Sequence, residues 1–174
     1  MTDKNLLVIT PHRKEPGKQR IAAYCRVSSR SDEQLNSLTN QINFYRSLFE
    51  NDDTVVFVGI YAEEGLSGTQ AESRPQFMKM IEDCRSGLID CIRTKSVSRF
   101  GRNTVDTLIY TRELRSLGID VFFEKENIHS TESSGELMLT LMAAFAESES
   151  ETMSENIKWG KRRRYEQGIT GSIT

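Results

Sequence analysis

The sequence has few residues of the kinds that form disulfide frameworks or metal sites. Its 174 residues include three cysteines, Cys25, Cys84 and Cys91, and two histidines, His12 and His129. An odd number of scattered cysteines argues against a disulfide framework. Neither histidine lies near a cysteine cluster with the spacing of zinc ligands. We therefore expect no disulfide, no metal site and a location in the reducing cytoplasm.

Long hydrophobic runs and a strong net charge are also missing. No apolar segment has the length of a membrane span and no signal-peptide pattern is present, so we expect no membrane association. The formal net charge is −2, which does not by itself indicate a nucleic-acid partner. Positive charge is instead clustered in residues 11–20, in residues 93–102 and in the run KRRR at residues 161–164. Such runs often form only a solvated face, so the clusters alone are weak evidence.

What the sequence does contain is an alternation of strand-like and helix-like segments. Short apolar runs predict strands at residues 21–27, 54–61, 88–94 and 119–123. Between them, apolar residues at three- and four-residue steps predict helices that follow Ser31, Pro75 and Thr104. This order predicts an α/β fold with a mostly parallel sheet of four to five strands, flanked by helices on both faces.

The last segment predicts one long helix. Residues 136–167 contain no proline and a single glycine, Gly160, and a helical stripe of apolar residues runs through them. At about 1.5 Å per residue this helix would reach roughly 50 Å, which is longer than a small domain is wide. We therefore expect it to project and to pack on another chain, although a core helix of a larger domain is the alternative. The stripe consists of Met138, Met142, Phe145, Met153 and Ile157.

The first candidate site lies at the end of the first predicted strand. Arg26 and Ser28 are two residues apart, so their side chains point to the same face at the carboxyl end of the strand. Ligands bind at that edge in open α/β sheets. A serine before a helix is often a cap, but Ser31 already fills that role, which leaves Ser28 and Ser29 without a structural one. The planar fork of an arginine suits a phosphate.

Two further loops carry arginines and hydroxyl groups. Arg99 and Arg102 lie close to the start of a predicted helix, and Ser67 and Arg74 flank a glycine-rich turn. Each loop follows a strand, so all three should meet at one edge of the sheet. No phosphate-binding GxxxxGK[ST] loop and no poised histidine base accompany them. This combination favours phosphoryl transfer in which arginines stabilise the developing charge.

Five segments together resemble a known family. They read YCRVSS, EGLSGT…SRPQF, KSVSRFGRNTVD, FFEKENI and ESESETMSENIKWG, and they stand in this order between residues 21 and 168. In order and spacing they resemble the catalytic domain of the serine site-specific recombinases, most of all the large members found in integrases and transposases. Each motif alone is modest, and the five in register are specific.

The resemblance implies roles for individual residues. Ser28 matches the nucleophile, Arg26 and Arg99 match arginines on the nonbridging oxygens, and Arg74 is our candidate to assist the leaving group. Gln41 and Ser67 match polar positions that orient the site, and Glu149 matches an acidic residue near it. The full set of implied catalytic residues is Ser28, Arg26, Arg74, Arg99, Arg102, Gln41, Ser67, Glu63 and Glu149.

The resemblance also implies an activity and partners. The family cleaves and rejoins duplex DNA through a 5′-phosphoserine intermediate, in integration, excision or transposition, and needs neither a metal nor a nucleotide cofactor. Its long helix forms the homodimer and crosses the minor groove, and a tetramer assembles for exchange. The family's further DNA-binding domains are missing here, which suggests a truncated chain. The implied DNA-binding residues are Lys158, Lys161, Arg162, Arg163 and Arg164.

The sequence departs from the family at several positions. Glu63 stands where aspartate is frequent, Ser98 where some branches have an aspartate, and Glu151 where arginine is common. Arg93 lies in a strand expected to be buried on both faces, where an unpaired charge would be costly. Either Arg93 reaches a partner at the strand end or the position is altered.

These patterns lead to a favoured function, two alternatives and an expected division of the chain into three segments. The favoured function is DNA cleavage and rejoining, and the alternative is a non-catalytic DNA-binding dimerisation module of the same fold. A serine hydrolase is disfavoured because no histidine lies near a carboxylate and no GxSxG motif is present. Residues 1–18 are expected to be a flexible basic arm, residues 19–132 the α/β catalytic domain, and residues 133–168 the dimerisation and DNA-contacting helix.

Overall fold

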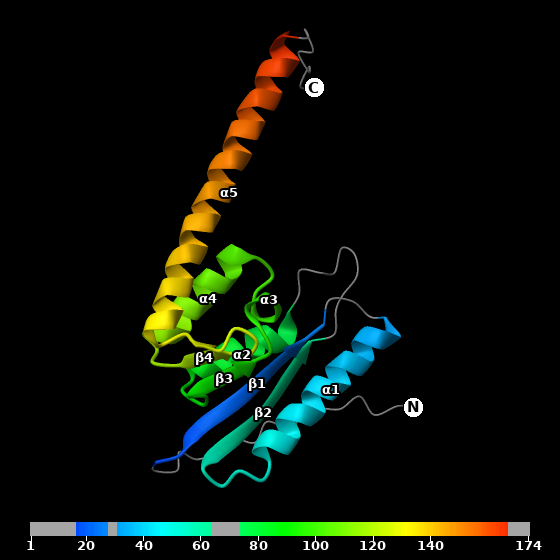
Figure 1. Ribbon diagram of the computed structural model, residues 1–174, viewed down its shortest axis with the longest axis vertical. Helices are drawn as coiled ribbons and strands as arrows, with labels where there is room; N and C mark the ends of the chain where they lie inside the picture. Colours follow the sequence, from blue (N-terminus) through cyan, green and yellow to red (C-terminus); the bar gives the residue numbers. More distant parts are fainter. Residues whose placement is uncertain (1–16, 28–30, 64–73, 167–174) are drawn as a thin grey trace.

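The computed structural model describes residues 17–27, 31–63 and 74–166 (Figure 1). Within the last helix it describes the side chains up to residue 148 and again at Trp159. Five strands form one sheet in the order β2-β1-β3-β4-β5. All neighbouring strands are parallel except β4 and β5, so the expected α/β fold is confirmed. The strands are β1 (Gln19–Arg26), β2 (Val55–Glu63), β3 (Cys91–Thr94), β4 (Asp120–Phe123) and β5 (Ile128–His129).

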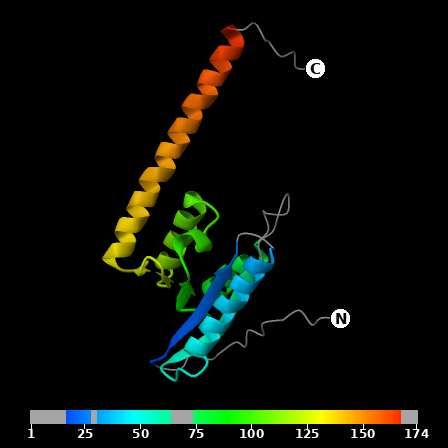
Figure 2. The same cartoon turned by 45° about the vertical axis from the view of Figure 1, so that its right-hand side comes forward.

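Helices cover the two faces of the sheet unequally. On one face α1 (Asp32–Phe49) packs over β1 and β2, through a cluster that includes Tyr45 and Phe49. The other face carries the remaining helices of the domain, and Figures 1 and 2 show α2 and α4 on the side away from α1. These are α2 (Pro75–Arg85), α3 (Val97–Phe100) and α4 (Thr104–Ser116).

The core under α2 and α4 is built from aromatic rings at the carboxyl half of the sheet. Tyr24 of β1 meets Phe77 edge-on, with ring centroids 5.3 Å apart. Phe100 contacts Phe77 at 5.2 Å and Phe123 at 5.7 Å, again edge-on. All four rings are buried. Because edge-to-face packing fixes the positions of the rings, this part of the core supports the loops that follow the strands.

Arg93 is the one residue of β3 that is only half-buried. It lies on the α1 face of β3, half-buried, and its guanidinium sits 4.4 Å from the centroid of the Phe122 ring. The guanidinium also lies 5.9 Å from the centroid of the Phe49 ring of α1, and the buried Nε makes no hydrogen bond within the described residues. The other residues of β3 are buried, as expected, and Arg93 is placed beside aromatic faces.

The long helix α5 (Ser133–Glu166) has 34 residues, as the sequence predicted, and reaches about 51 Å. It begins against the turn after β5, where a Cβ on Gly135 would lie 2.4 Å from the carbonyl oxygen of His129. The helix then runs beside α4 and continues away from the domain (Figures 1 and 2). Its buried contact is Leu139, whereas Leu137, Leu141 and Phe145 leave 60%, 52% and 65% of their surface exposed.

Within the described ranges, no helix combines the length and the apolar character that a bilayer span needs.

Candidate active site at the carboxyl edge of the sheet

Arg26 is the last residue of β1 and is held by the segment around α3. Its Nε donates to the carbonyl oxygen of Arg99 at 3.0 Å. Its Nη2 donates to the carbonyl oxygens of Ser98 at 2.7 Å and Gly101 at 3.1 Å. Burial lowers the pKa of the Arg26 guanidinium, and the positive charges of Arg74 and Arg99 act in the same direction. Arg26 therefore lies within electrostatic reach of two of the three other predicted arginines, Arg74 and Arg99.

Arg74 occupies the N-cap position of α2 and lies directly over the aromatic core. Its Nη2 donates to the hydroxyl of Tyr24 at 2.9 Å and also to the carbonyl oxygen of Phe100. The guanidinium carbon lies 3.6 Å from the centroid of the Phe77 ring. Only 7% of Arg74 is exposed, and its buried Nε makes no hydrogen bond within the described residues. Arg74 is therefore held mainly by Tyr24, Phe77 and Phe100.

The carbonyl groups of residues 98–101 hold both arginines in place. Three of them accept from Arg26 and the fourth accepts from Arg74. They belong to the end of the four-residue helix α3 and to the residue after it, where carbonyl groups lack partners along the helix. Because carbonyl oxygens carry partial negative charge, this arrangement offsets the repulsion between neighbouring guanidinium groups.

Glu63 places a carboxylate beside this cluster. It ends β2 and is paired in register with Arg26. One carboxylate oxygen accepts from the backbone N–H of Gln76 at 2.6 Å, in the first turn of α2. Burial raises the pKa of Glu63, while the backbone hydrogen bonds and the charges of Arg74 and Arg26 oppose that rise. Glu63 thus binds the start of α2 to the end of β2.

The site consists of three arginines at the carboxyl end of β1. Comparison with known proteins shows the family to which the chain belongs. The sequence profile of the resolvase N-terminal domain matches residues 21–170. The chain belongs to the resolvase N-terminal domain family. This is the catalytic-domain type of the serine recombinases, so the resemblance drawn from the five motifs is confirmed.

Individual resolvase relatives agree with this assignment. The chain is 32% identical over 140 residues to the transposon Tn552 resolvase of Staphylococcus aureus, which covers 79% of this chain and 64% of that protein. It thus spans less than two thirds of the relative. A resolvase family site-specific recombinase from Streptococcus pneumoniae is 28% identical, with a TM-score of 0.73, over 86% of this chain and 99% of that one. The N-terminal catalytic domain of TP901-1 integrase shares the fold, at 24% identity and a TM-score of 0.60, over 78% of this chain and 99% of that one.

Two further predicted residues of the resolvase site are Arg102 and Gln41. Arg102 is exposed, and its Nε donates to the carboxylate of Asp106 at 3.2 Å in the first turn of α4. Gln41 lies on α1, in the layer on the opposite face of the sheet from Tyr24 and Phe77. Its Nε2 donates to the carbonyl oxygen of Ser37 at 3.3 Å, and its buried Oε1 makes no hydrogen bond within the described residues. The orienting role of Gln41 stays a prediction.

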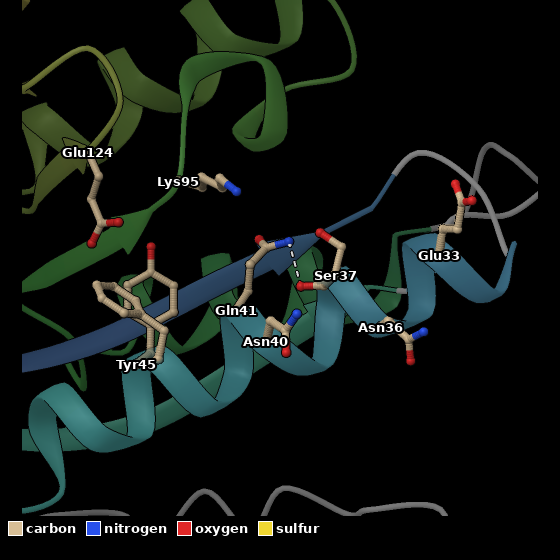
Figure 3. Close-up of a pocket in the computed structure, with 9 residues that line it drawn as sticks. Glu33, Asn36, Ser37, Asn40, Gln41, Tyr45, Lys95 and Glu124 are labelled. Atoms are coloured by element: carbon tan, nitrogen blue, oxygen red, sulfur yellow. Dashed lines mark hydrogen bonds between the residues drawn. The ribbon is translucent and has the colours of Figure 1, made fainter.

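A separate cavity of about 460 Å³ surrounds Gln41. Figure 3 shows the side chains of Gln41 and Tyr45 pointing from α1 toward the ends of β3 and β4, where Lys95 and Glu124 lie. Burial raises the pKa of Glu124. The cavity lies on the α1 face, whereas the arginine cluster lies on the α2 face.

Several predicted residues fall outside what the structure describes. Ser28 and Ser67 lie in segments that are not described, although Val27, the residue before Ser28, still bonds through its N–H to the carbonyl oxygen of Glu63 at 3.5 Å. Glu149 lies on α5, but its side chain is not described. The same holds for the side chains of Lys158, Lys161, Arg162, Arg163 and Arg164. Their roles stay predictions.

The sequence reading missed the residues that hold the resolvase arginines. Tyr24 and Phe77 lie under Arg74, and the backbone carbonyl of Phe100 binds it. One signal was available, because Tyr24 is two residues before Arg26 on the same strand and so shares its face. No sequence pattern predicts which backbone carbonyl groups will accept hydrogen bonds from the arginines.

Proposed function

We propose that this domain cleaves and rejoins duplex DNA, with Ser28 as the nucleophile of a site-specific recombinase. The observation that carries the proposal is that Arg26 and Arg74 bind neighbouring carbonyl groups of Arg99 and Phe100 at the end of β1. Arg26 stands two residues before Ser28 along the chain. These cationic groups would attract an anionic substrate to this edge of the sheet. A phosphodiester is such a substrate, because its nonbridging oxygens match the arginine fork.

The reaction follows from these groups. The Ser28 oxygen attacks the phosphorus of a backbone phosphodiester and forms a new P–O bond. The bond from phosphorus to the 3′ oxygen breaks, the serine proton leaves to solvent or a neighbouring group, and the 3′ oxygen leaves as a hydroxyl. Arg26 and Arg99 stabilise the negative charge that grows on the nonbridging oxygens, and Arg74 assists the leaving oxygen. The protein is then joined to the 5′ phosphate through Ser28.

The intermediate explains how the strands can be rejoined without a cofactor. One phosphodiester is exchanged for a phosphoserine ester, so the bond energy needed for rejoining is kept. Attack by a 3′ hydroxyl on the same phosphorus reverses the step and releases Ser28. We therefore propose a reaction that requires no metal and no nucleotide. Removing divalent ions with a chelator should leave cleavage unchanged.

The proposed partners are duplex DNA and further copies of the same chain. Leu137, Leu141 and Phe145 lie at steps of four on α5 and are exposed, which suits a second α5 in a homodimer. The cations at residues 158–164 follow on the same helix, where they would meet DNA phosphates. A tetramer of two dimers would hold two DNA duplexes for exchange. The domain would act where DNA lies, in the cytoplasm.

The test is the trapping of a covalent protein–DNA complex. The protein at its full natural length is incubated with supercoiled plasmids that carry a library of inserts, and the reaction is stopped with detergent. We expect DNA bound covalently to the wild type and not to Ser28→Ala, while Ser29→Ala behaves as the wild type. If Ser28→Ala still forms the complex, Ser28 is not the nucleophile. If the wild type binds DNA without forming it, the chain is the non-catalytic dimerisation module.

A further inference from the structure

We propose that Tyr24 is a positioning residue of the arginine cluster, whose hydroxyl fixes the guanidinium of Arg74 in one orientation. This inference rests on the proposed function, because the orientation of Arg74 matters to chemistry only if the cluster binds the reacting phosphate. Tyr24 would not itself touch the DNA. It would act through Arg74.

The position of the Tyr24 hydroxyl is determined by the core. Tyr24 is fully buried, and its ring packs edge-on against Phe77 at 5.3 Å and Phe100 at 6.4 Å. A ring enclosed in this way has a single available orientation at close packing. Burial also raises the pKa of Tyr24, so the hydroxyl stays neutral at physiological pH. Its oxygen therefore offers Arg74 a fixed acceptor.

Three contacts together restrain the guanidinium of Arg74. The Phe77 ring lies below its plane at 3.6 Å and limits tilting. The Tyr24 hydroxyl, at 2.9 Å from Nη2, and the carbonyl oxygen of Phe100 limit rotation within the plane. An arginine side chain otherwise has many rotamers, and the positive charges of Arg26 and Arg99 nearby would push it outward. Loss of the hydroxyl removes one of the two in-plane restraints.

Tyr24 also connects Arg74 to the strand that leads to the nucleophile. Tyr24 and Arg26 are two residues apart on β1 and share one face of the sheet. Arg26 is bound by carbonyl groups of residues 98–101, and Phe100 in that segment binds Arg74. The Tyr24 hydroxyl thus connects Arg74 to β1, and the carbonyl groups of residues 98–101 connect Arg74 and Arg26 to one common segment.

The variant that tests this is Tyr24→Phe, which keeps the ring and removes the hydroxyl oxygen. Tyr61→Phe is its matched control, because Tyr61 is equally buried, pairs with Tyr24 in the sheet, and has a hydroxyl that donates to Asp83 at 2.6 Å, away from the arginines. We expect Tyr24→Phe to slow formation of the covalent DNA complex about 10- to 100-fold. The DNA dissociation constant should change by less than about twofold, and Tyr61→Phe should keep the wild-type rate.

A second background separates positioning from a general structural effect. If Tyr24 acts through Arg74, Tyr24→Phe should cause no further loss of rate when Arg74 is already replaced by Arg74→Lys. Nitrogen NMR of the guanidinium groups gives a readout that does not depend on DNA. Slow rotation about the Cζ–Nη bonds of Arg74 should be seen in the wild type and in Tyr61→Phe, and it should become fast in Tyr24→Phe.

The outcomes distinguish this inference from the proposed function. If the wild type forms a covalent complex and Tyr24→Phe forms it equally fast, positioning by Tyr24 is wrong and DNA cleavage stands. If Tyr61→Phe slows the reaction as much as Tyr24→Phe, the effect is structural and the inference is wrong. If the wild type forms no complex at all, the proposed function fails, and the NMR comparison alone decides whether Tyr24 holds Arg74.

Discussion

Phe145 offers a quantitative test of the dimer proposed for α5. It leaves 65% of its surface exposed in the single chain. Complete burial of a phenylalanine side chain stabilises by about 1.5–3 kcal/mol, so burying the exposed part is worth about 1–2 kcal/mol. In a two-fold symmetric dimer the residue is buried twice, which gives about 2–4 kcal/mol. We expect Phe145→Ser to weaken dimerisation about 30- to 1,000-fold.

The matched control is Phe44→Ser. Phe44 is also a phenylalanine on a helix and leaves 51% of its surface exposed, but it lies on α1, over the other face of the domain. Sedimentation equilibrium at several protein concentrations gives the dimer dissociation constant for the wild type and both variants. Equal helix content by circular dichroism shows that α5 is intact. The reasoning is refuted if Phe145→Ser dimerises like the wild type, or if Phe44→Ser is weakened to the same extent.

Three further variants test other parts of the molecule. Gly101→Ala would place a Cβ 1.8 Å from the Thr107 hydroxyl oxygen and displace a carbonyl group that binds Arg26. Thermal unfolding should show a loss of stability of about 1–3 kcal/mol. Wild-type stability in this variant would contradict the expected clash. Burial alone would raise the pKa of Asp120, but hydrogen bonds from His129 and from Thr131 hold it below its usual value. The stability that this carboxylate contributes is present above about pH 4 and is lost as the pH falls through the pKa of folded Asp120. Urea unfolding should therefore find Asp120→Asn less stable than the wild type at pH 6, and the difference in unfolding free energy should close by about pH 2. A difference that stays constant with pH would refute this. Alanine at residues 162–164 should lower the slope of log DNA affinity against log salt by about 2–3, and an unchanged slope would exclude phosphate contacts there.

Local patterns allowed most of the fold to be predicted. The helix predicted after Pro75 is α2, and its apolar residues at three- and four-residue steps, Phe77, Met80, Ile81 and Cys84, are the four that the structure buries. Gly87 ends the helix with a positive φ of 70°, as a glycine at that position does. These features depend only on residues close together along the chain, which is why a single sequence was sufficient.

Two features of the sheet carried no recognisable local pattern and were not predicted. Strand β5 has only two residues, and it exists because β4 offers a free edge and Asp120 binds the turn after β5 through Ser130 and Thr131. The same limit applies to Arg93, because its place beside Phe122 depends on how far α1 extends across the sheet. β5 is too short to show an alternating pattern, and the surroundings of Arg93 depend on a helix far from it along the chain.

For the candidate site too, the sequence predicted one part of the arrangement and not another. That loops after three strands would bring Arg26, Arg74 and Arg99 to one edge followed from the strand order and from the rule that such edges bind ligands. How the arginines are held did not follow, because backbone carbonyl groups and a buried tyrosine are their partners. The position of Gln41 on the other face also required coordinates, since both helix and sheet must be placed to know it.

Mass-spectrometric mapping of the covalent complex tests the proposed chemistry most directly. After the bound DNA is digested with nuclease, the peptide that carries Ser28 should hold a nucleotide attached through a 5′ phosphate to the serine oxygen. The freed DNA strand should end in a 3′ hydroxyl. A nucleotide found on Ser29 or on any other residue, or a linkage through a 3′ phosphate, would contradict the mechanism in which three arginines activate a phosphodiester for attack by Ser28.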